Sequence, residues 1–391
     1  MASLRRPRPK SAGRSDATDV RVAIAHDWLV RYAGSERCVE QMLVEFPGAR
    51  LLTSVVNRDA LPASFAHAEP SLLQKVPGAT RRHELLLPLM PAAWRFRDAV
   101  RDVDVVVSSS HACAKAVRFE GAIPHACYCH TPMRYAWDFP SEASRFPRPV
   151  RRLAPHAMTW FRRWDRATSE RVTTFVANSS AVAARIQAAY GRRAEVIHPP
   201  VRTEFFTPAG ERGDDYLYVG RLVSYKRADL VVEAFRGLPY RLFVVGRGHL
   251  ESSLRASAPD NVVFLGNVSD ERLRQLYRTA RALVFPANED FGIAMAEAQA
   301  CGTPVVGLAQ GGALDIVADG RTGWLLETAT IDQLRSTIRR TAGERLDDAA
   351  IAAEAQRFSA TRFRAALREV VDQAIDQHPQ RPRLKKLTRA A

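Results

Sequence analysis

The sequence of 391 residues has no long hydrophobic run and few cysteines, and each shortage excludes a class of protein. Apolar stretches such as Leu242–Val245 are far shorter than the roughly 20 residues that cross a bilayer. The basic N-terminal segment has no apolar core before Asp16 and Asp19, so we expect no cleaved secretory signal and a cytoplasmic protein. The five cysteines, an odd number without paired spacing, argue against a disulfide framework or a zinc ribbon.

A metal site is also not expected, although two segments carry possible ligands. Cys127, Cys129 and His130 lie close together, but alternate residues of a strand put the cysteines on one face and the histidine on the other. Asp102 and Asp104 have the spacing of a metal-binding pair, yet they precede a buried strand, where acids commonly cap a loop. We therefore expect an activity that does not depend on a metal.

The formal net charge of +15 is concentrated at the two ends of the chain. Residues 1–18 are predicted to be a disordered basic arm, and residues 379–391 a basic tail. Such ends attract polyanions, either anionic lipid headgroups or nucleic acid, and the simpler alternative is that they only increase solubility. A non-catalytic protein that binds polyanions or a membrane surface is thus one hypothesis for function.

The rest of the sequence predicts the α/β class with two domains. Its length exceeds that of a typical single domain of about 100 to 200 residues. Short β-branched runs alternate with amphipathic stretches, which is typical of parallel sheets covered by helices. The predicted strands form two series: 20–25, 51–56, 103–108, 125–129 and 174–177, followed by 216–219, 241–245, 262–265, 282–285 and 304–307.

Two adjacent prolines, Pro199–Pro200, stop helix propagation and separate the two series of strands. We therefore predict one domain over residues 19–200 and a second over 201–357. Beyond Gly323 the chain is expected to be helical, and apolar residues at helical spacing predict a last helix over 358–378.

Gly34 lies where the first predicted strand turns into a helix. A glycine at this position lets backbone amides approach a phosphate, and the dipole of the helix favours negative charge there. Gly34 is therefore a candidate contact for a diphosphate. The alternative is that a tight turn alone requires the glycine.

Arg221 and Lys226 follow the first strand of the second domain. Parallel sheets bind ligands at the carboxyl ends of their strands, and a forked arginine with a compact lysine charge suits a departing diphosphate. The alternative is a solvated basic start of a helix. Cations at a helix N-terminus oppose its dipole, so that explanation is less natural.

Two acids border a predicted Ala-rich helix, with Glu289 in the loop before it and Glu297 about two turns inside it. The amides of Phe291, Gly292 and Ile293 are expected to form a free helix N-terminus that binds phosphate or sugar oxygens. A glycosidase would need both carboxyls at one bond, and the spacing along the helix is too great for that.

His130 follows a strand of the first domain and is expected to face the cleft between the domains. Its two ring nitrogens could orient a sugar hydroxyl. A lone histidine is more often structural, so His130 is a candidate only in combination with the other site residues.

Together these segments resemble glycosyltransferase family 4, which has the GT-B fold of two facing Rossmann-like domains. The likeness covers about residues 20–376. Residues 130–134, with Trp137 and Asp138, further resemble the bacterial mannosyltransferases that build O-antigen and other surface polysaccharides. The segments that carry the family likeness are Glu289 to Glu297, Gly220-Arg221-Leu222 with Tyr225-Lys226-Arg227, and Asn178-Ser179-Ser180 with Arg185-Ile186 and His198-Pro199-Pro200-Val201.

The resemblance implies a retaining, metal-independent hexosyltransferase that uses a nucleotide sugar as substrate and needs no cofactor. GDP-mannose is favoured over a UDP-sugar. The N-terminal domain would hold the acceptor and the C-terminal domain the nucleotide sugar, with the last helix crossing back onto the N-terminal domain. By this resemblance, the diphosphate would be bound by Gly34, Arg221 and Lys226, and the ribose by Glu297. The donor sugar would be bound by Glu289 and by the backbone of Phe291, Gly292 and Ile293. His130 would lie beside the reacting sugar.

Two residues depart from the family pattern. Ala33 stands where the family usually has the first glycine of a pair, which alters one flexible contact to phosphate. Arg202 stands where an acid usually follows Pro-Pro-Val, which changes the hinge and should not touch the chemistry. A sugar-nucleotide epimerase or a phosphorylase on the same fold is the alternative among enzymes.

The preferred acceptor is a lipid-linked oligosaccharide, by the same resemblance, with no specific nucleic acid partner. Apolar residues in 85–96, together with Trp160, Phe161 and Trp164, are interspersed with arginines. They predict a face that touches the inner side of the plasma membrane, and ordinary core packing is the alternative.

Overall fold

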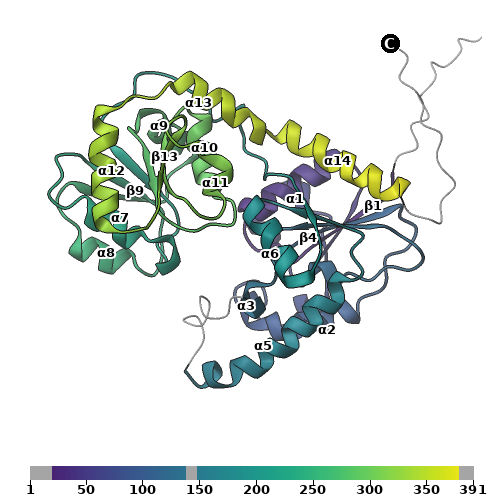
Figure 1. Cartoon of the computed structure of the whole chain (residues 1–391). Coiled ribbons are helices and arrows are strands. Elements are labelled where there is room, and N and C mark those ends of the chain that lie inside the picture. Colours follow the sequence, from purple (N-terminus) through teal and green to yellow (C-terminus); the bar gives the residue numbers. More distant parts are fainter. Residues whose placement is uncertain (1–19, 138–147, 378–391) are drawn as a thin grey trace, which may run out of the picture.

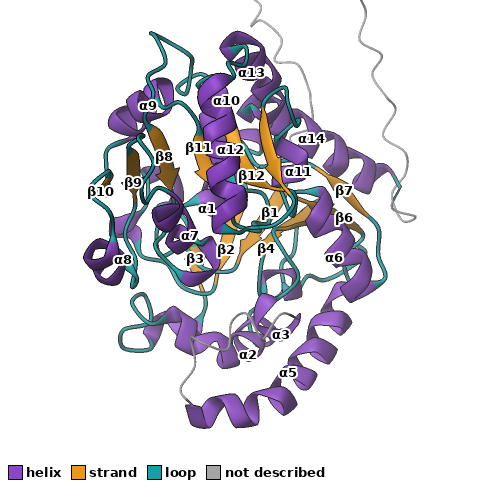
Figure 2. Cartoon of the chain, turned by 60° about the vertical axis from the view of Figure 1, so that its left-hand side comes forward, coloured by secondary structure: helices purple, strands orange, loops and turns teal. Residues whose placement is uncertain are grey.

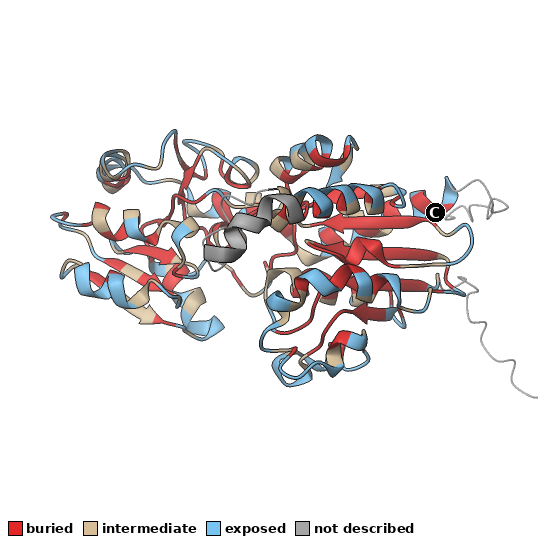
Figure 3. Cartoon of the chain, turned by 90° about the horizontal axis from the view of Figure 1, so that it is seen from below, coloured by how far each residue is buried: buried red, intermediate tan, exposed pale blue. Residues whose placement is uncertain are grey.

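The computed structural model describes residues 20–137 and 148–377, and it divides into two lobes (Figure 1). The predicted basic arm and basic tail lie outside the described residues. Each lobe contains one parallel sheet covered by helices, as Figure 2 shows. Figure 3 shows buried residues concentrated in the strands of both lobes. The predicted fold, α/β with two Rossmann-like domains, is confirmed.

The sheet of the N-terminal domain contains β1 (Val22–His26), β2 (Arg50–Thr53), β3 (Glu69–Pro70), β4 (Val105–Ser110), β5 (His125–Cys129), β6 (Thr174–Ala177) and β7 (Ala194–Val196). All neighbouring strands are parallel, in the order β3-β2-β1-β4-β5-β6-β7. The order reverses between β1 and β4, and ligands bind outside the carboxyl ends of strands at such a point. The short strands β3 and β7 are additions to the predicted series.

The sheet of the C-terminal domain contains β8 (Tyr216–Val219), β9 (Leu242–Val245), β10 (Val262–Gly266), β11 (Leu283–Phe285), β12 (Val305–Leu308) and β13 (Gly323–Leu326). Its order, β10-β9-β8-β11-β12-β13, reverses between β8 and β11. The expectation of a helical chain beyond Gly323 is wrong at its start, because β13 pairs with β12. A Cβ on Gly323 would lie 2.1 Å from the carbonyl oxygen of Val305, so only glycine allows this approach.

The helices that cover the two sheets are α1 (Gly34–Glu45), α2 (Met90–Arg95), α3 (Arg134–Trp137), α5 (Arg148–Ser169), α6 (Ser180–Tyr190), α7 (Ala228–Ala234), α8 (Glu251–Ser257), α9 (Asp270–Thr279), α10 (Ile293–Ala300), α11 (Ala313–Ile316), α12 (Ile331–Gly343), α13 (Asp348–Ala355) and α14 (Ala360–Asp376). In the described part of the chain, none is both long enough and apolar enough to cross a membrane.

Helix α14 packs on the N-terminal domain although it follows the C-terminal domain in sequence (Figure 1). The Ser359 side chain accepts a hydrogen bond from the Arg362 amide and caps the helix. Phe363, Leu367 and Val371 are buried in one core cluster with residues of β1 and β4. The predicted crossover of the last helix is confirmed.

Two segments of the chain pass between the domains side by side. Residues 197–201 lead into the C-terminal domain, and Phe358 and Ser359 lead back. The Val201 amide donates a hydrogen bond of 2.8 Å to the Phe358 carbonyl. The two passages are therefore bonded to each other.

A buried ion pair ties α5 to the N-terminal sheet. Lys115, in the turn after β4, pairs with Asp165 of α5, and both side chains are buried. Asp165 also accepts hydrogen bonds of 2.7 Å from Trp137 Nε1 and from the Tyr190 hydroxyl. Burial lowers the pKa of Lys115, but the Asp165 carboxylate outweighs it and raises the pKa to about 12. Lys115 is therefore a buried charge that depends on Asp165.

Candidate active site between the two domains

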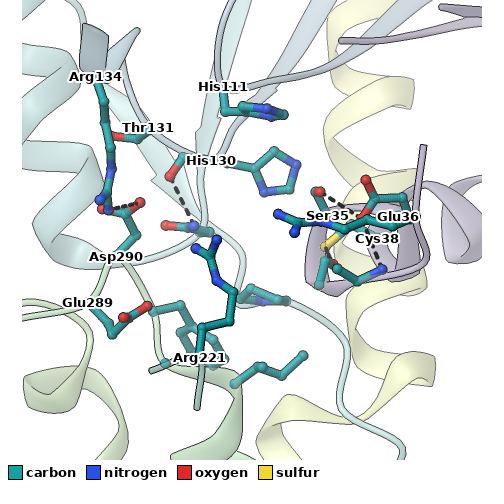
Figure 4. Close-up of a pocket in the computed structure, with 18 of the residues that line it drawn as sticks. Ser35, Glu36, Cys38, His111, His130, Thr131, Arg134, Arg221, Glu289 and Asp290 are labelled. Carbon is teal, nitrogen blue, oxygen red and sulfur yellow. Dashed lines mark hydrogen bonds and ion pairs between the residues drawn. The ribbon is translucent and has the colours of Figure 1, made fainter. Parts of the chain in front are cut away.

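The carboxyl ends of the central strands of both sheets meet at one pocket between the domains (Figure 4). Its volume is about 320 Å³. The lining residues that follow central strands are Trp28 after β1, His111 after β4, His130 after β5, Arg221 after β8 and Glu289 after β11. The two sheets thus present their ligand-binding edges to each other.

The pocket brings together the predicted site residues except Lys226 and Glu297. The lining contains Gly34, His130, Arg221, Glu289, Phe291, Gly292 and Ile293. These positions come from both domains and from segments far apart in the sequence. The geometry therefore unites them at one place, and the role of each residue stays a prediction.

Helix α10 begins at Ile293, at the wall of the pocket. Gly292 precedes the helix with a φ of 95°, and a Cβ there would lie 2.2 Å from Cε of Met295. The first amides of a helix have no acceptor within it, and its dipole favours negative charge. This turn can therefore receive a phosphate or a sugar oxygen, and its shape depends on the glycine.

Arg221 and Lys226 have different surroundings. Arg221 is exposed, and its Nη2 donates a hydrogen bond of 2.7 Å to the Tyr225 hydroxyl. No carboxylate among the described residues pairs with Arg221, so its charge is available to a ligand. Lys226 Nζ lies 2.8 Å from Glu289 Oε1, so Lys226 reaches the pocket through that carboxylate.

Glu297 is held away from the pocket by a residue of the other domain. Arg37 of α1 donates a hydrogen bond of 2.6 Å to its Oε1, and the Tyr277 hydroxyl donates one of 3.3 Å to its Oε2. Burial raises the pKa of Glu297 above its ordinary value, and Arg37 offsets part of this increase. Glu297 lies one turn into α10, four residues after Ile293, where the sequence suggested two turns.

His130 is fixed at the N-terminal side of the pocket. Its Nε2 lies 2.8 Å from Ser109 Oγ, and its carbonyl accepts a hydrogen bond of 3.0 Å from Asn178. Burial, and then the neighbouring His111 and His26, lower the pKa of His130 to about 3. The ring is therefore neutral at physiological pH and can act as a hydrogen-bond donor or acceptor.

Sequence reasoning missed a second pocket histidine, His111. Its Nδ1 lies 3.3 Å from Asp27 Oδ2, and Asp27 also accepts hydrogen bonds from the backbone amides of residues 111–114. Burial lowers the pKa of His111, and Asp27 opposes this shift. The available signal was that each of these residues directly follows a strand of a parallel sheet.

Ion pairs across the pocket hold the domains together. Asp290 of the C-terminal domain pairs with both Arg134 and Arg185 of the N-terminal domain. The Ser180 amide donates a hydrogen bond of 2.7 Å to Asp315 Oδ2. These contacts join the two domains directly.

The acidic pair Asp102 and Asp104 lies at the opposite end of the sheet from the pocket. Asp104 Oδ2 accepts a hydrogen bond of 2.9 Å from the Arg21 amide, beside the start of β4. Asp102 has a φ of 56° in the loop before that strand. Within the described ranges, no three His, Cys, Asp or Glu side chains are grouped as a metal site would require.

The facing sheets, the start of α10 at the pocket and the available charge of Arg221 agree with a glycosyltransferase of the GT-B type. Residues 32–205 match Glycosyltransferase Family 4, and residues 202–358 match Glycosyl transferases group 1. The two matches together span most of the chain. The chain belongs to glycosyltransferase family 4.

Curated relatives include two D-inositol 3-phosphate glycosyltransferases. The protein of Mycobacteroides abscessus is 37% identical over 159 residues, which is 35% of this chain and 36% of the relative. That of Mycobacterium sp. (strain JLS) is 36% identical over 188 residues, which is 39% of this chain and 42% of the relative. The matches thus span less than half of each relative, and they support glycosyltransferase activity in general.

Solved structures share the fold over nearly the whole chain. HepE from Anabaena, in complex with UDP and glucose, has a TM-score of 0.66 and 18% identity, covering 90% of this chain and 99% of HepE. Sucrose-phosphate synthase from Thermosynechococcus elongatus also has a TM-score of 0.66, with 17% identity, covering 90% of this chain and 98% of the synthase.

Proposed function

We propose that this enzyme is a retaining hexosyltransferase that moves a sugar from a nucleoside diphosphate to a glycan or lipid-linked acceptor in surface polysaccharide synthesis. The observation that carries the proposal is the pocket in which Arg221, the start of α10 and His130 meet between the domains. In this proposal the C-terminal domain binds the donor and the N-terminal domain binds the acceptor.

The chemistry follows from the charges in the pocket. As the bond between the anomeric carbon and the diphosphate oxygen breaks, negative charge develops on the diphosphate. Arg221 and the first amides of α10 stabilise this charge, and each preorganised contact of this kind contributes about 3 kcal/mol. The acceptor oxygen bonds to the anomeric carbon on the same face, and its proton passes to the departing phosphate oxygen. The anomeric configuration is therefore retained.

GDP-mannose is the proposed donor. The support is the likeness of the segment that begins at His130 to bacterial mannosyltransferases. HepE holds UDP in its structure, which makes a UDP-sugar the second candidate.

Calorimetric titration of the full chain with GDP and with UDP tests the donor. We expect GDP to bind at least about tenfold more tightly, equivalent to about 1.4 kcal/mol. Tighter binding of UDP would indicate that the donor is a UDP-sugar instead of GDP-mannose. Binding of neither nucleotide would contradict the proposal of a nucleotide-sugar enzyme.

Product analysis separates transfer from the alternatives. The full chain is incubated with the nucleotide sugar whose base it binds more tightly and with a lipid-linked oligosaccharide, in the presence of EDTA. The products are identified by mass spectrometry and NMR. We expect a glycoside of retained configuration and full activity in the chelator. An epimerised nucleotide sugar or a sugar phosphate would indicate an epimerase or a phosphorylase. Polyanion binding without turnover would indicate a binding protein.

The helix η4 (His83–Leu89) leads from the pocket to an exposed apolar surface. His83 and Glu84 line the pocket, whereas Leu85 and Leu89 of the same helix are exposed. This arrangement supports an acceptor whose sugar end enters the pocket while its lipid end stays outside. The lipid-linked acceptor is thus proposed on the shape of this segment as well as on the family likeness.

We call this exposed surface the apolar patch, and it consists of Leu85, Leu89, Phe96 and Trp160. Phe96 is 76% exposed and Leu85 70%. Helices α2 and α5, which carry or border these residues, lie side by side in both Figure 1 and Figure 2. Exposed arginines surround the patch, at positions 81, 82, 95, 162 and 163. Trp94 and Phe161, which the sequence assigned to the same face, are instead buried in the core.

Vesicle binding tests the membrane contact. The double variant Leu89→Gln with Phe96→Gln should bind vesicles containing phosphatidylglycerol about tenfold or more weakly, because burial of each side chain contributes about 1.5–3 kcal/mol. The control, Val44→Gln with Leu314→Gln, changes two exposed apolar residues elsewhere and should bind normally. Equal sedimentation of both variants with the vesicles would exclude the patch as the contact.

A further inference from the structure

We propose that Ser109 and His26 are positioning residues that fix His130 in the tautomer with its proton on Nδ1. This arrangement prepares the pocket for a sugar, and its role in catalysis rests on the proposed function. The three side chains come from neighbouring parts of the sheet. His26 ends β1, Ser109 is its paired residue on β4, and His130 directly follows β5.

His26 carries a proton on Nδ1. Its Nδ1 lies 3.0 Å from the backbone carbonyl oxygen of Ser109. A carbonyl oxygen only accepts hydrogen bonds, so this contact requires a proton on Nδ1. His26 is completely buried, so bulk solvent does not reach this position. The tautomer of His26 is therefore determined by the main chain.

Ser109 donates its hydroxyl proton to His130. Its Oγ lies 3.1 Å from His26 Nδ1 and 2.8 Å from His130 Nε2. Because His26 Nδ1 already carries a proton, it cannot accept the hydroxyl proton. The hydroxyl therefore donates to His130 Nε2. The opposite direction would leave a buried hydroxyl proton without an acceptor, which proteins rarely tolerate.

His130 in turn carries its proton on Nδ1. A neutral imidazole that accepts at Nε2 carries its proton on Nδ1. The ring lines the pocket, as Figure 4 shows, so this N–H is the donor that remains for a ligand. It would hold a hydroxyl oxygen of the bound sugar as an acceptor. At this point the pocket thus binds a hydrogen-bond acceptor of the sugar.

Glu36 connects this chain to the loop that contains Gly34. Glu36 Oε1 lies 3.7 Å from His26 Nε2, while its Oε2 accepts hydrogen bonds from the Ala33 amide and from Ser35 Oγ at 3.1 and 3.0 Å. Burial raises the pKa of Glu36, but the hydrogen bonds that its carboxylate accepts lower it to about 2. The carboxylate is therefore ionised and holds the loop that contains Gly34 beside His26.

The sheet supplies a matched control. Ser108 precedes Ser109 on β4, and its Oγ lies 2.7 Å from Nε2 of the buried His125. This second serine–histidine pair has the same chemistry and the same strands. Successive residues of a strand point to opposite faces, so Ser108 lies on the other side of the sheet, and His125 does not line the pocket. Replacing Ser109 or Ser108 with alanine removes one buried hydroxyl in each case, so the two variants are matched.

The experiment measures the tautomer by NMR of the full chain labelled with ¹⁵N-histidine, with His130 assigned through a His130→Asn variant. In the unmodified chain, His130 should show a protonated Nδ1 and an unprotonated Nε2. Ser109→Ala should shift these resonances, and Ser108→Ala should leave them in place. A protonated Nε2 in the unmodified chain, or unchanged His130 resonances in Ser109→Ala, would overturn the proposal.

Kinetics then connect the tautomer to transfer. Ser109→Ala should lower kcat about tenfold or more while the KM for the donor changes little, and Ser108→Ala should keep both values. Equal kcat in the two variants would overturn the positioning role. If the chain transfers no sugar at all, the proposed function fails, and the NMR result still decides the tautomer.

Discussion

Replacing Arg221 with alanine is expected to lower the turnover number for sugar transfer by about a hundredfold or more. Arg221 has no carboxylate partner among the described residues, so its charge is preserved for the ligand. In the pocket, such a cation acts on the charge that develops on the leaving diphosphate, and removing it raises the barrier by about 3 kcal/mol. Initial-rate measurements at saturating donor check this value.

The control for this variant is Arg255→Ala. Arg255 lies on α8, outside the pocket, and pairs with Glu251 one turn earlier. The two variants lose the same charge from the same domain, so a non-specific effect of net charge would reduce both. Normal turnover in Arg221→Ala would contradict the proposal that Arg221 stabilises the leaving diphosphate. Lys226 is a less direct test, because its replacement also leaves Glu289 without its ion-pair partner.

Replacing Lys115 with methionine is expected to lower the free energy of unfolding of the N-terminal domain by about 3–5 kcal/mol. The change leaves the Asp165 carboxylate buried without its cation, although Trp137 and Tyr190 still donate to it. A buried charge without a partner costs more than the lost packing of the lysine chain. The midpoint and slope of urea unfolding, followed by circular dichroism, give the value.

The double variant Lys115→Met with Asp165→Asn separates charge from packing. Asparagine keeps a carbonyl oxygen that can accept from Trp137 and Tyr190, but it carries no charge. We expect the double variant to recover most of the stability lost by Lys115→Met. If Lys115→Met lowers the free energy of unfolding by less than about 1 kcal/mol, Lys115 and Asp165 are not a buried charge pair.

The sequence predicted the fold through features that are local. Apolar runs rich in β-branched residues at 103–108 and in aromatic residues at 216–219 identified strands, because parallel strands are buried on both faces. The turn at Gly34 and the loop with Glu289 follow predicted strands, and α/β sheets bind ligands at the carboxyl ends of their strands. Strands β3, β7 and β13 were missed; each lies at the edge of its sheet, and β3 and β7 contain no buried residue, so they lack the continuous apolar run of a central strand.

The contacts of the site were not predictable, because they join residues distant in sequence. Arg37 and Glu297 meet across the domains although 260 positions separate them. The chain from Glu36 through His26 and Ser109 to His130 depends on which strands are neighbours. Local patterns contain no information on that order. The apolar patch was predicted as a region, but only packing determined which of its aromatic residues are exposed.

The paired passages between the domains limit how the enzyme can open. Val201 and Phe358 are bonded to each other, so both crossings lie on one line. Rotation about that line widens the pocket at its far side, whereas sliding one domain along the other would break the bond between the passages. Release of the nucleotide product should therefore proceed by a single-axis swing, with the ion pairs of Asp290 opening first because they lie on the pocket side.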